Sequence, residues 1–550
     1  MKENDLWYKR GVFYALDVET FQDSNNDGIG DFQGLISRLD YISTLGITCI
    51  WLLPFYPTPN LDNGYDVSDY YNVDERLGSL GDFAAFIQES KERGIRVVID
   101  LVVNHTSSQH PWFQAARKDP NSEYRDYYIW RKTKPGKPHA EPILKGGNED
   151  IWEYDEVAKE YFLHRFYSHQ PDLNISNPAV RKEIHHIMQF WLALGVSGFR
   201  VDAAHILVQN HENNGKDEFY DLVEDMRTFI HSHSHGAILL AEATGSRTIV
   251  GKFFKGDSRM HMMFSFLLNE RLFLAFARSE ANPIKEGLEK LPEKSFSSQW
   301  LNFLRHHDEL NLEGLTAKER NEVFEAFAPE ETMRYLGRGI RRRLAPMLDG
   351  DLKRMQLAYS LLFSMPGTPL IQYGAEIGMG EDLSRKGRES VRTSMQWSDT
   401  DNAGFSVVKN VKLAKPVIST GPFSYKKINV ENQRRQPDSL LNWMTRLIGL
   451  RRQLPEICHG NCAVLNIRDK GILAHTCSLT SQLLIVHNLS NEAKEVKLKE
   501  LNQDGISELF SDSFYDLPDK GNVKLEPYGY RWFRLPPITV PTARQSVAKR

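Results

Sequence analysis

The segment Val196-Ser197-Gly198-Phe199-Arg200-Val201-Asp202 is a short, mostly apolar run that ends in a carboxylate. Its length and composition predict a buried strand, and an acid that ends such a strand is exposed only at the strand's C-terminal edge. Two other apolar runs, 237–242 and 301–308, end in the same way at Glu242 and Asp308. If the three strands lie in one barrel-like sheet, their carboxylates converge on one pocket, so the sequence predicts a site of acid chemistry.

Strand-like runs alternate with helix-like stretches from about residue 11 to residue 375. This repetition indicates parallel strands that are covered by helices. About eight such units over this length favour an α/β fold of the (β/α)8 TIM barrel type over an open sheet. Strands are expected at 11–16, 49–53 and 96–100 and near residues 200, 240, 263, 303 and 371, with helices at 35–45 and 82–93.

The regular alternation stops at two points. Residues 104–174 are rich in proline, glycine, aromatic residues and charge, which predicts an inserted subdomain after the third strand. Short alternating strands over 465–537 predict a C-terminal antiparallel β domain, a β-sandwich. The barrel would then consist of 1–103 and 175–464, and the polar, basic segment 538–550 is predicted to be a disordered tail.

Length, charge and cysteine content exclude several classes of protein. The 550 residues suit two or three domains, and a net charge of -4 argues against nucleic acid or an anionic membrane as the main partner. No apolar run approaches the roughly 20 residues that span a bilayer, and the polar N-terminus lacks the apolar stretch of a signal peptide. Four cysteines are too few for a disulfide framework. The sequence therefore predicts a cytoplasmic protein with free thiols.

The predicted carboxylates fit the chemistry of glycosidic bond cleavage, which needs two carboxyl groups on either side of the anomeric carbon. One attacks or stabilises positive charge, and the other donates and then takes a proton. Arg200 lies two residues before Asp202, so both side chains lie on one face of the strand. The guanidinium favours the ionised carboxylate that a nucleophile requires. A single acid at a strand end is more often structural, and these neighbours are what favour catalysis.

Four segments resemble, in order and spacing, the conserved regions of the α-amylase family, glycoside hydrolase family 13. Asp100 to His105 matches the first region, Gly198 to His205 the second, Glu242 the third and His307-Asp308 the fourth. The segment Gly64-Tyr65-Asp66 adds to the resemblance. Four motifs in this arrangement are highly specific.

The resemblance implies a role for each matching residue. Asp202 would be the nucleophile and Glu242 the general acid/base, while Asp308 would hold sugar hydroxyls and stabilise the transition state. The residues implied to bind the first glucosyl unit are Tyr65, His105, Arg200 and His307, with Tyr65 stacked on the sugar ring.

Asp66 and Arg392 match a pair that closes the pocket behind the first glucose in related enzymes. A closed end would restrict the enzyme to the terminal residues of short substrates. The alternative is an ordinary surface ion pair, which contributes little.

Narrower similarity points to one group within the family. Residues 170–174 resemble the fifth region of enzymes that act on small α-glucosides, such as oligo-1,6-glucosidases and trehalose synthases. Segments at 23–32, 341–346 and 391–397 are most similar to the trehalose synthases. This implies a retaining enzyme that interconverts maltose and trehalose through a covalent glucosyl-enzyme intermediate. Its partner would be a small α-glucoside such as maltose or trehalose, without an organic cofactor, and a homo-oligomer is left open.

Several residues depart from the trehalose synthase pattern. Ala243-Thr244-Gly245-Ser246 stands where an Asn-rich, aromatic stretch is usual, and His306 replaces a common Asn. These positions govern what enters after glucose, so an α-1,4-glucosidase or transglucosidase of short α-glucosides remains an alternative. A non-catalytic binding protein on the same fold is a remote alternative, because all three acids are retained.

Two calcium sites are candidates. The spacing of oxygen side chains in residues 23–28 is that of a calcium loop, with Asp31 as a further acid, although a polar turn would look the same. Similar segments in related glucosidases bind calcium. The candidate ligands there are Asp23, Asn25, Asp27, Ile29 and Asp31. Asn104 and Asp172 match ligands of a second calcium site beside the insert.

Overall fold

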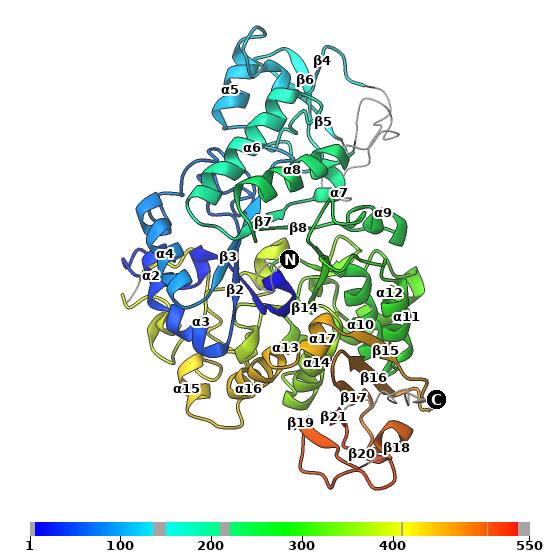
Figure 1. Cartoon of the computed structure of the whole chain (residues 1–550). Coiled ribbons are helices and arrows are strands. Elements are labelled where there is room, and N and C mark those ends of the chain that lie inside the picture. Colours follow the sequence, from blue (N-terminus) through cyan, green and yellow to red (C-terminus); the bar gives the residue numbers. More distant parts are fainter. Residues whose placement is uncertain (1–5, 136–149, 210–219, 409–410, 503, 537–550) are drawn as a thin grey trace, which may run out of the picture.

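The computed structural model describes residues 6–135, 150–209, 220–408, 411–502 and 504–536. At its centre, parallel strands close into a barrel of order β1-β14-β10-β9-β8-β7-β3-β2 (Figure 1), which confirms the predicted TIM barrel. These strands are β1 (Phe13–Leu16), β2 (Cys49–Leu52), β3 (Arg96–Leu101), β7 (Gly198–Val201), β8 (Ile238–Ala241), β9 (Met262–Phe264), β10 (Gln299–Phe303) and β14 (Thr368–Gln372).

Alternate residues of the barrel strands face the barrel interior and the surrounding helices. Ile238 and Leu240 of β8 belong to the central apolar cluster, whereas Leu239 between them packs with the outer core. On the neighbouring strand β7, the corresponding inward position is Arg200, which donates to Asp100 of β3. The apolar filling of the barrel thus gives way to charged groups toward the carboxyl ends of its strands.

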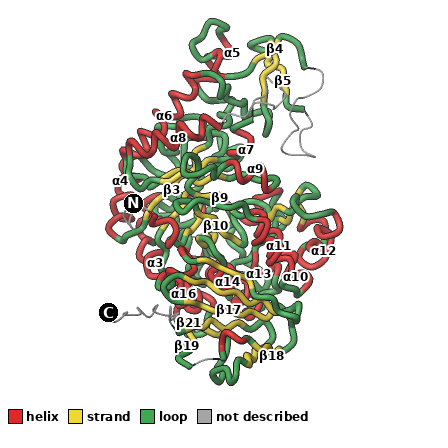
Figure 2. Tube along the Cα trace, turned by 45° about the vertical axis from the view of Figure 1, so that its right-hand side comes forward, coloured by secondary structure: helices red, strands yellow, loops and turns green. Residues whose placement is uncertain are grey.

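Helices cover the outside of the barrel in both views (Figures 1 and 2). The helix predicted at 35–45 is two helices, α2 and α3, which meet at Arg38. The helices are α1 (Trp7–Arg10), α2 (Phe32–Ser37), α3 (Leu39–Leu45), α4 (Leu80–Glu92), α5 (Pro111–Lys118), α6 (Pro178–Ala193), α7 (Ala204–Leu207), α8 (Tyr220–His233), α9 (Arg247–Lys252), α10 (Phe266–Arg278), α11 (Asn282–Lys290), α12 (Ala317–Phe327), α13 (Leu344–Met347), α14 (Leu352–Ser364), α15 (Val430–Arg434), α16 (Leu440–Arg452) and α17 (Pro455–His459).

The excursion after β3 forms a separate lobe at the top of Figure 1. It contains α5 and a small antiparallel sheet of order β4-β6-β5, with β4 at Trp130–Arg131, β5 at Trp152–Asp155 and β6 at Glu160–Leu163. Its two ends meet beside β3, where the backbone N–H of Leu173 donates to the carbonyl oxygen of Asn104 at 2.9 Å. The insert is therefore anchored at the carboxyl end of the barrel.

A second excursion follows β10. It contains α12 and a small sheet of order β11-β13-β12, formed by Leu310–Asn311, Gly339–Ile340 and Arg334–Tyr335. This sheet places Glu309 and Arg338 within 2.9 Å of each other, next to Asp308. The second excursion thus supplies charged side chains to the same end of the barrel.

The C-terminal part is the predicted antiparallel β domain. One sheet has the order β15-β16-β17-β21-β19, and a second pairs β18 with β20. The first strand lies before residue 465, where the sequence analysis placed the boundary. The strands are β15 (Asn461–Val464), β16 (Ile472–Ser478), β17 (Gln482–Asn488), β18 (Lys494–Lys497), β19 (Ser507–Ser511), β20 (Asn522–Leu525) and β21 (Tyr530–Leu535).

The expectation of free thiols is wrong for two of the four cysteines. Cys462 of β15 and Cys477 of β16 lie directly opposite each other, with Cα atoms 4.2 Å apart, and form a disulfide. Cys49 and Cys458 are free and buried. The sequence gives no sign of this pairing, because it depends on the register of the two strands.

None of the helices in the described part of the chain combines the length and the apolar composition that a membrane span requires. The predicted disordered tail, 538–550, lies outside the described residues.

Candidate active site

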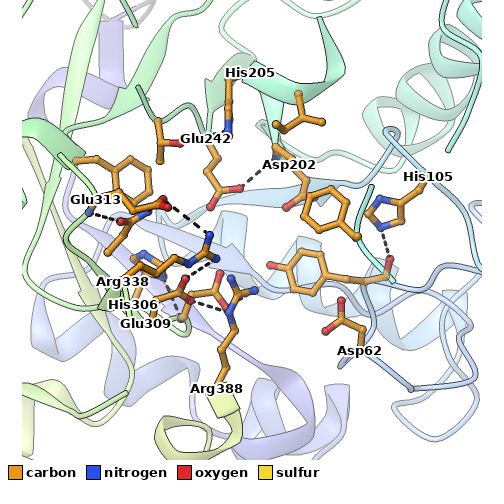
Figure 3. Close-up of a pocket in the computed structure, with 18 of the residues that line it drawn as sticks. Asp62, His105, Asp202, His205, Glu242, His306, Glu309, Glu313, Arg338 and Arg388 are labelled. Atoms are coloured by element: carbon orange, nitrogen blue, oxygen red, sulfur yellow. Dashed lines mark hydrogen bonds and ion pairs between the residues drawn. The ribbon is translucent and has the colours of Figure 1, made fainter. Parts of the chain in front are cut away.

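The three predicted catalytic carboxylates gather at the carboxyl ends of barrel strands. Asp202 directly follows β7, Glu242 directly follows β8, and Asp308 lies in the segment after β10. All three line one cavity of about 330 Å³ (Figure 3), to whose wall the insert contributes Phe166 and Tyr167. Asp202 and Asp308 are less than a tenth exposed. The convergence expected from the three strand ends is therefore present in the fold.

Arg200 contacts the carboxylates of three residues, Asp100, Asp202 and Glu242. Its Nη1 donates to Asp100 Oδ1 at 2.6 Å and also to Asp202 Oδ1. Its Nη2 lies 2.8 Å from Glu242 Oε2, which also accepts a hydrogen bond from the backbone N–H of Ala203 at 3.2 Å. One guanidinium is thus shared among three acids, and its single positive charge cannot balance three negative charges.

This shared contact leaves the pKa values of the three acids raised. Burial raises the pKa of Glu242 against the opposing effect of Arg200, and the charge of Asp202 adds to the rise. Burial also raises the pKa of Asp202, again against Arg200. It raises the pKa of Asp100 to about 7. Arg200 favours the ionised form of Asp202, as expected from the sequence, but burial outweighs it. A raised pKa at Glu242 favours its protonated form, which a general acid needs.

Asp308 differs from these three acids because two arginines form ion pairs with it. Arg392 Nη2 lies 2.8 Å and Arg388 Nη1 lies 3.3 Å from Asp308 Oδ1. Burial alone would raise the pKa of Asp308, but Arg388 and Arg392 hold it well below its usual range. Asp308 therefore remains a carboxylate, able to accept hydrogen bonds from sugar hydroxyls and to stabilise positive charge.

The predicted binding residues lie around these acids. Tyr65 and His105 line the cavity, and His105 Nε2 lies 3.1 Å from the carbonyl oxygen of Tyr65. His307 lies behind Tyr65, with the two rings nearly parallel at 5.8 Å and a 2.8 Å contact between Tyr65 Oη and His307 Nε2. Burial lowers the pKa of His105 to about 4, so this ring is neutral. A neutral ring can both donate and accept hydrogen bonds with hydroxyls.

The predicted pair of Asp66 and Arg392 is not formed. Asp66 is fully buried, and its carboxylate accepts the backbone N–H groups of Leu61 and Asp62, each at 3.0 Å. Arg392 instead pairs with Asp308. Asp66 therefore shapes the turn that carries Asp62, and Asp62 is the acid of this segment that reaches the cavity wall.

Sequence reasoning missed several charged residues of the wall. Asp62, Glu309, Arg338 and Arg388 all line the cavity, and Figure 3 shows Glu309 and the two arginines opposite His105. Arg388 Nε donates to Glu309 Oε2 at 2.7 Å, which links the segment before Arg392 to the segment after Asp308. The only signal in the sequence is proximity to predicted residues: Glu309 follows Asp308 directly.

The two departures singled out in the sequence, Thr244 and His306, both line the cavity. Thr244 Oγ1 lies 3.2 Å from His205 Nε2. His306 Nδ1 accepts the backbone N–H of Asp308 at 3.1 Å, and burial lowers the pKa of His306 to about 3. Both positions therefore shape the wall of the cavity beside the acids.

The candidate calcium loop at 23–31 is folded as a tight polar turn. Asp23 accepts the backbone N–H groups of Asn26 at 2.6 Å and Gly28 at 3.0 Å, and Gly28 has a φ of +89°. Asp31 accepts the backbone N–H of Gly34 and caps α2. The buried Oδ1 of Asn26 has no hydrogen-bond partner. Oxygen side chains and a glycine at the sharp bend are features that this turn shares with calcium loops, and the unpartnered oxygen belongs to Asn26, between the predicted ligands Asn25 and Asp27.

The second predicted calcium site does not fit a metal. Arg165 Nη2 donates to Asn104 Oδ1 at 2.5 Å, its Nε donates to Asp172 Oδ2, and its Nη1 donates to the carbonyl oxygen of Ile206 at 2.8 Å. Arg165, Asn104 and Asp172 are all buried. The guanidinium of Arg165 therefore occupies the position between the two predicted ligands. The prediction that Asn104 and Asp172 bind calcium is wrong for this reason.

Replacing Arg165 with methionine is expected to lower the free energy of unfolding by about 3–5 kcal/mol, because it leaves the buried Asp172 carboxylate without a cation. Chemical denaturation of both proteins measures the change. The matched control is Lys159→Met in the same insert, whose ion pair with Glu156 is exposed and contributes little. Equal small losses in both variants would contradict the structural role of Arg165.

Comparisons with known proteins agree with this geometry. Residues 18–460 match the family model of the alpha amylase catalytic domain, and residues 481–534 match a sucrose hydrolase-like C-terminal domain. The chain is 40% identical over 541 residues to a trehalose synthase of Thermus thermophilus, covering 97% of this chain and 56% of that protein. It therefore spans about half the length of that relative.

A second relative is covered almost fully. The chain is 38% identical over 560 residues to the trehalose synthase/amylase TreS of Mycolicibacterium smegmatis, covering 98% of this chain and 94% of that protein. Among solved structures, the isomaltulose synthase of Klebsiella sp. LX3 superposes with a TM-score of 0.78 at 27% identity, covering 96% of this chain and 99% of that one.

Proposed function

This chain belongs to the alpha-amylase family, and we propose that it interconverts maltose and trehalose through a covalent glucosyl-enzyme intermediate. Full-length similarity to proteins named trehalose synthase supports the proposal. The observation that carries it is the site itself. Three carboxylates with two different electrostatic environments face one cavity of about 330 Å³, near the lower limit for small-ligand pockets. A cavity of this size favours a short saccharide and the retention of a freed glucose.

The first half of the reaction uses a proton carried by Glu242, whose pKa burial raises. Glu242 donates it to the glycosidic oxygen of maltose while Asp202 attacks the anomeric carbon, so the bond between that carbon and the oxygen breaks and an ester to Asp202 forms. Asp308 stabilises the positive charge that develops on the sugar. A glucose molecule is released within the cavity.

The second half reverses these roles. The retained glucose turns so that its anomeric hydroxyl faces the ester, Glu242 takes the proton of that hydroxyl, and the new bond to the anomeric carbon releases Asp202. Two successive displacements retain the configuration of the transferred glucosyl unit. Water in place of the glucose would give hydrolysis through the same steps.

Hydrolysis is the second candidate function, and one observation favours it. Thr244 lines the cavity, and the small residues Gly245 and Ser246 follow it, where trehalose synthases usually carry a larger stretch. A less filled wall gives water more access to the ester on Asp202. The alternative is therefore an α-1,4-glucosidase or transglucosidase of short α-glucosides.

Incubating the protein with maltose and separating the products distinguishes the two functions. The proposal predicts trehalose as the main product, with glucose as a minor one. Glucose as the sole product would contradict the proposal and support the hydrolase.

We propose that the loop at 23–31 binds one calcium ion, with Asp23, Asn25 and Asp27 among the ligands. Removing calcium with a chelator is then expected to lower the melting temperature, because an ion that binds only the folded state stabilises it. Calorimetry with and without added calcium measures the shift, and Asp23→Ala should abolish it. A melting temperature that is the same with chelator and with calcium would contradict the site.

We also propose that 104–174 and the C-terminal segment, which begins with β15 rather than at the predicted residue 465, fold as domains distinct from the barrel. The separate sheets that each contains support this division. A cytoplasmic location stays a prediction, which cell fractionation would test. The oligomeric state is left open, and gel filtration would determine it.

A further inference from the structure

A cavity of about 360 Å³ lies among the outer helices and shares no lining residue with the catalytic cavity. Residues of α3 and α15 line it, and these two helices lie at the lower left of Figure 1, whereas the insert lies at the top. The charged, hydroxyl-bearing and aromatic side chains of its lining are Arg38, Tyr41, Trp397, Ser398, Glu431 and Arg434.

Two arginines of this lining are stacked on aromatic rings. Arg38 Cζ lies 4.2 Å from the ring centroid of Trp397, and Arg434 Cζ lies 5.2 Å from that of Tyr41. The rings of Trp397 and Tyr41 are buried and meet edge to face, with their centroids 5.0 Å apart. Because a cation is attracted to an aromatic face, this pair of rings holds the two guanidiniums at one cavity.

Neither guanidinium forms an ion pair with any residue of the described ranges. Arg38 Nε donates to the neutral Oε1 of Gln22 at 2.7 Å. Burial and the positive charge of Arg434 lower the pKa of Arg38, and Tyr41 acts in the opposite direction. Glu431 is the acid on the cavity wall, but its carboxylate accepts a hydrogen bond from the exposed Arg435. The cavity therefore holds two positive charges that no acid compensates by direct contact.

The two guanidiniums indicate an anionic ligand. Each offers N–H donors in a planar fork that matches the oxygens of a phosphate group. Arg38 and Arg434 lie on different helices' ends, and a tetrahedral phosphate presents oxygens in several directions, whereas a carboxylate presents two oxygens at one edge. Ser398 adds a hydroxyl group to the same wall. The volume of about 360 Å³ lies within the range of small-ligand pockets, so it has room for more than a phosphate alone.

We propose that this cavity binds the phosphate group of a small metabolite, with Arg38 and Arg434 as the two guanidinium partners. The inference goes beyond the proposed function and does not depend on it. A bound phosphate compensates two like charges that lie near each other in the free protein. Since the cavity shares no residue with the catalytic cavity, the ligand should not compete with maltose.

Isothermal titration calorimetry at fixed ionic strength tests the site with inorganic phosphate, glucose 6-phosphate and glucose as probes. Arg434→Gln is expected to weaken the binding of the phosphate-bearing probe about tenfold, the loss for one hydrogen bond to a charged group. The binding of glucose, which lacks a phosphate, should stay unchanged. Because Arg434 is exposed, the variant should keep the fold, and thermal unfolding checks this.

Two substitutions of Arg38 give an independent measurement if Arg434→Gln folds poorly. Arg38→Gln should also weaken phosphate binding about tenfold. Arg38→Lys keeps the positive charge but not the planar fork, so it should retain part of the affinity. The matched control is Arg446→Gln, which removes an exposed arginine of α16 that does not line the cavity and should change no affinity.

The probes distinguish free phosphate from a sugar phosphate. Binding of inorganic phosphate or of glucose 6-phosphate that Arg434→Gln weakens supports the site, and a preference for glucose 6-phosphate identifies a sugar phosphate as the ligand. No binding of either probe, equal losses in Arg434→Gln and Arg446→Gln, or acetate bound as tightly as phosphate would overturn the inference. Competition with maltose that is the same in the wild type and in Arg434→Gln would place the probe in the catalytic cavity and would also overturn it.

Discussion

The Asp202→Asn variant is expected to convert maltose at least about 10⁴-fold more slowly than the wild type, as loss of a covalent nucleophile does in other enzymes. An asparagine amide has nearly the same shape as the carboxylate but cannot form the glucosyl ester. Arg200 keeps its contacts with Asp100 and Glu242, so the fold should remain. Initial rates of maltose consumption measure the effect, and thermal unfolding checks the fold.

The control for this variant is Asp150→Asn. Asp150 lies in the insert, pairs with Lys134 and does not line the catalytic cavity. The control substitution should leave the rate unchanged. A rate within about tenfold of the wild type in Asp202→Asn, with a normal melting temperature, would refute the assignment of the nucleophile.

The Glu242→Gln variant is expected to lose about 10²–10⁴ in rate on maltose, the usual contribution of a general acid. The loss should be much smaller on α-glucosyl fluoride, because fluoride leaves without receiving a proton. Comparing the initial rates on the two substrates measures the difference. An equal loss on both substrates would assign Glu242 a role other than proton donation.

The pH dependence provides a second test of Glu242. Burial raises its pKa, and the acid form is the active one, so activity is expected to fall as the pH rises through this raised pKa. On the acid side, activity falls as the nucleophile Asp202 becomes protonated. Wild-type kcat/KM should therefore trace a bell-shaped curve, and Glu242→Gln should lose its alkaline limb. An alkaline limb that persists in this variant would have to come from another group.

Two of the three candidate catalytic acids could be placed from local sequence and one topological rule. Asp202 and Glu242 directly follow β7 and β8, and parallel strands in a closed barrel present their carboxyl ends on one face. Arg200 could be placed in the same way, because its position two residues before Asp202 puts both on one face. Asp308 reaches the same cavity although β10 ends at Phe303, so the strand predicted to run to Asp308 is shorter than expected.

The residues that could not be predicted depend on contacts between distant segments. Arg388 reaches Asp308 only because the chain after β14 folds back over the segment after β10. Arg165 reaches Asn104 and Asp172 only when the insert closes at its base. The oxygen side chains of Asn104 and Asp172 do lie close together, as predicted, but they bind the guanidinium of Arg165 in place of a metal. The register that joins Cys462 to Cys477 is likewise a property of the folded sheet.

The most direct test of the account is the fate of trehalose in the presence of excess ¹³C-labelled glucose. The account predicts that maltose forms from trehalose and carries little label, because the glucose freed by Glu242 and Asp202 stays in the cavity until it is rejoined. Glucose as the only product, or maltose labelled to the level of the added glucose, would contradict the retention of the freed sugar and with it the proposed intramolecular transfer.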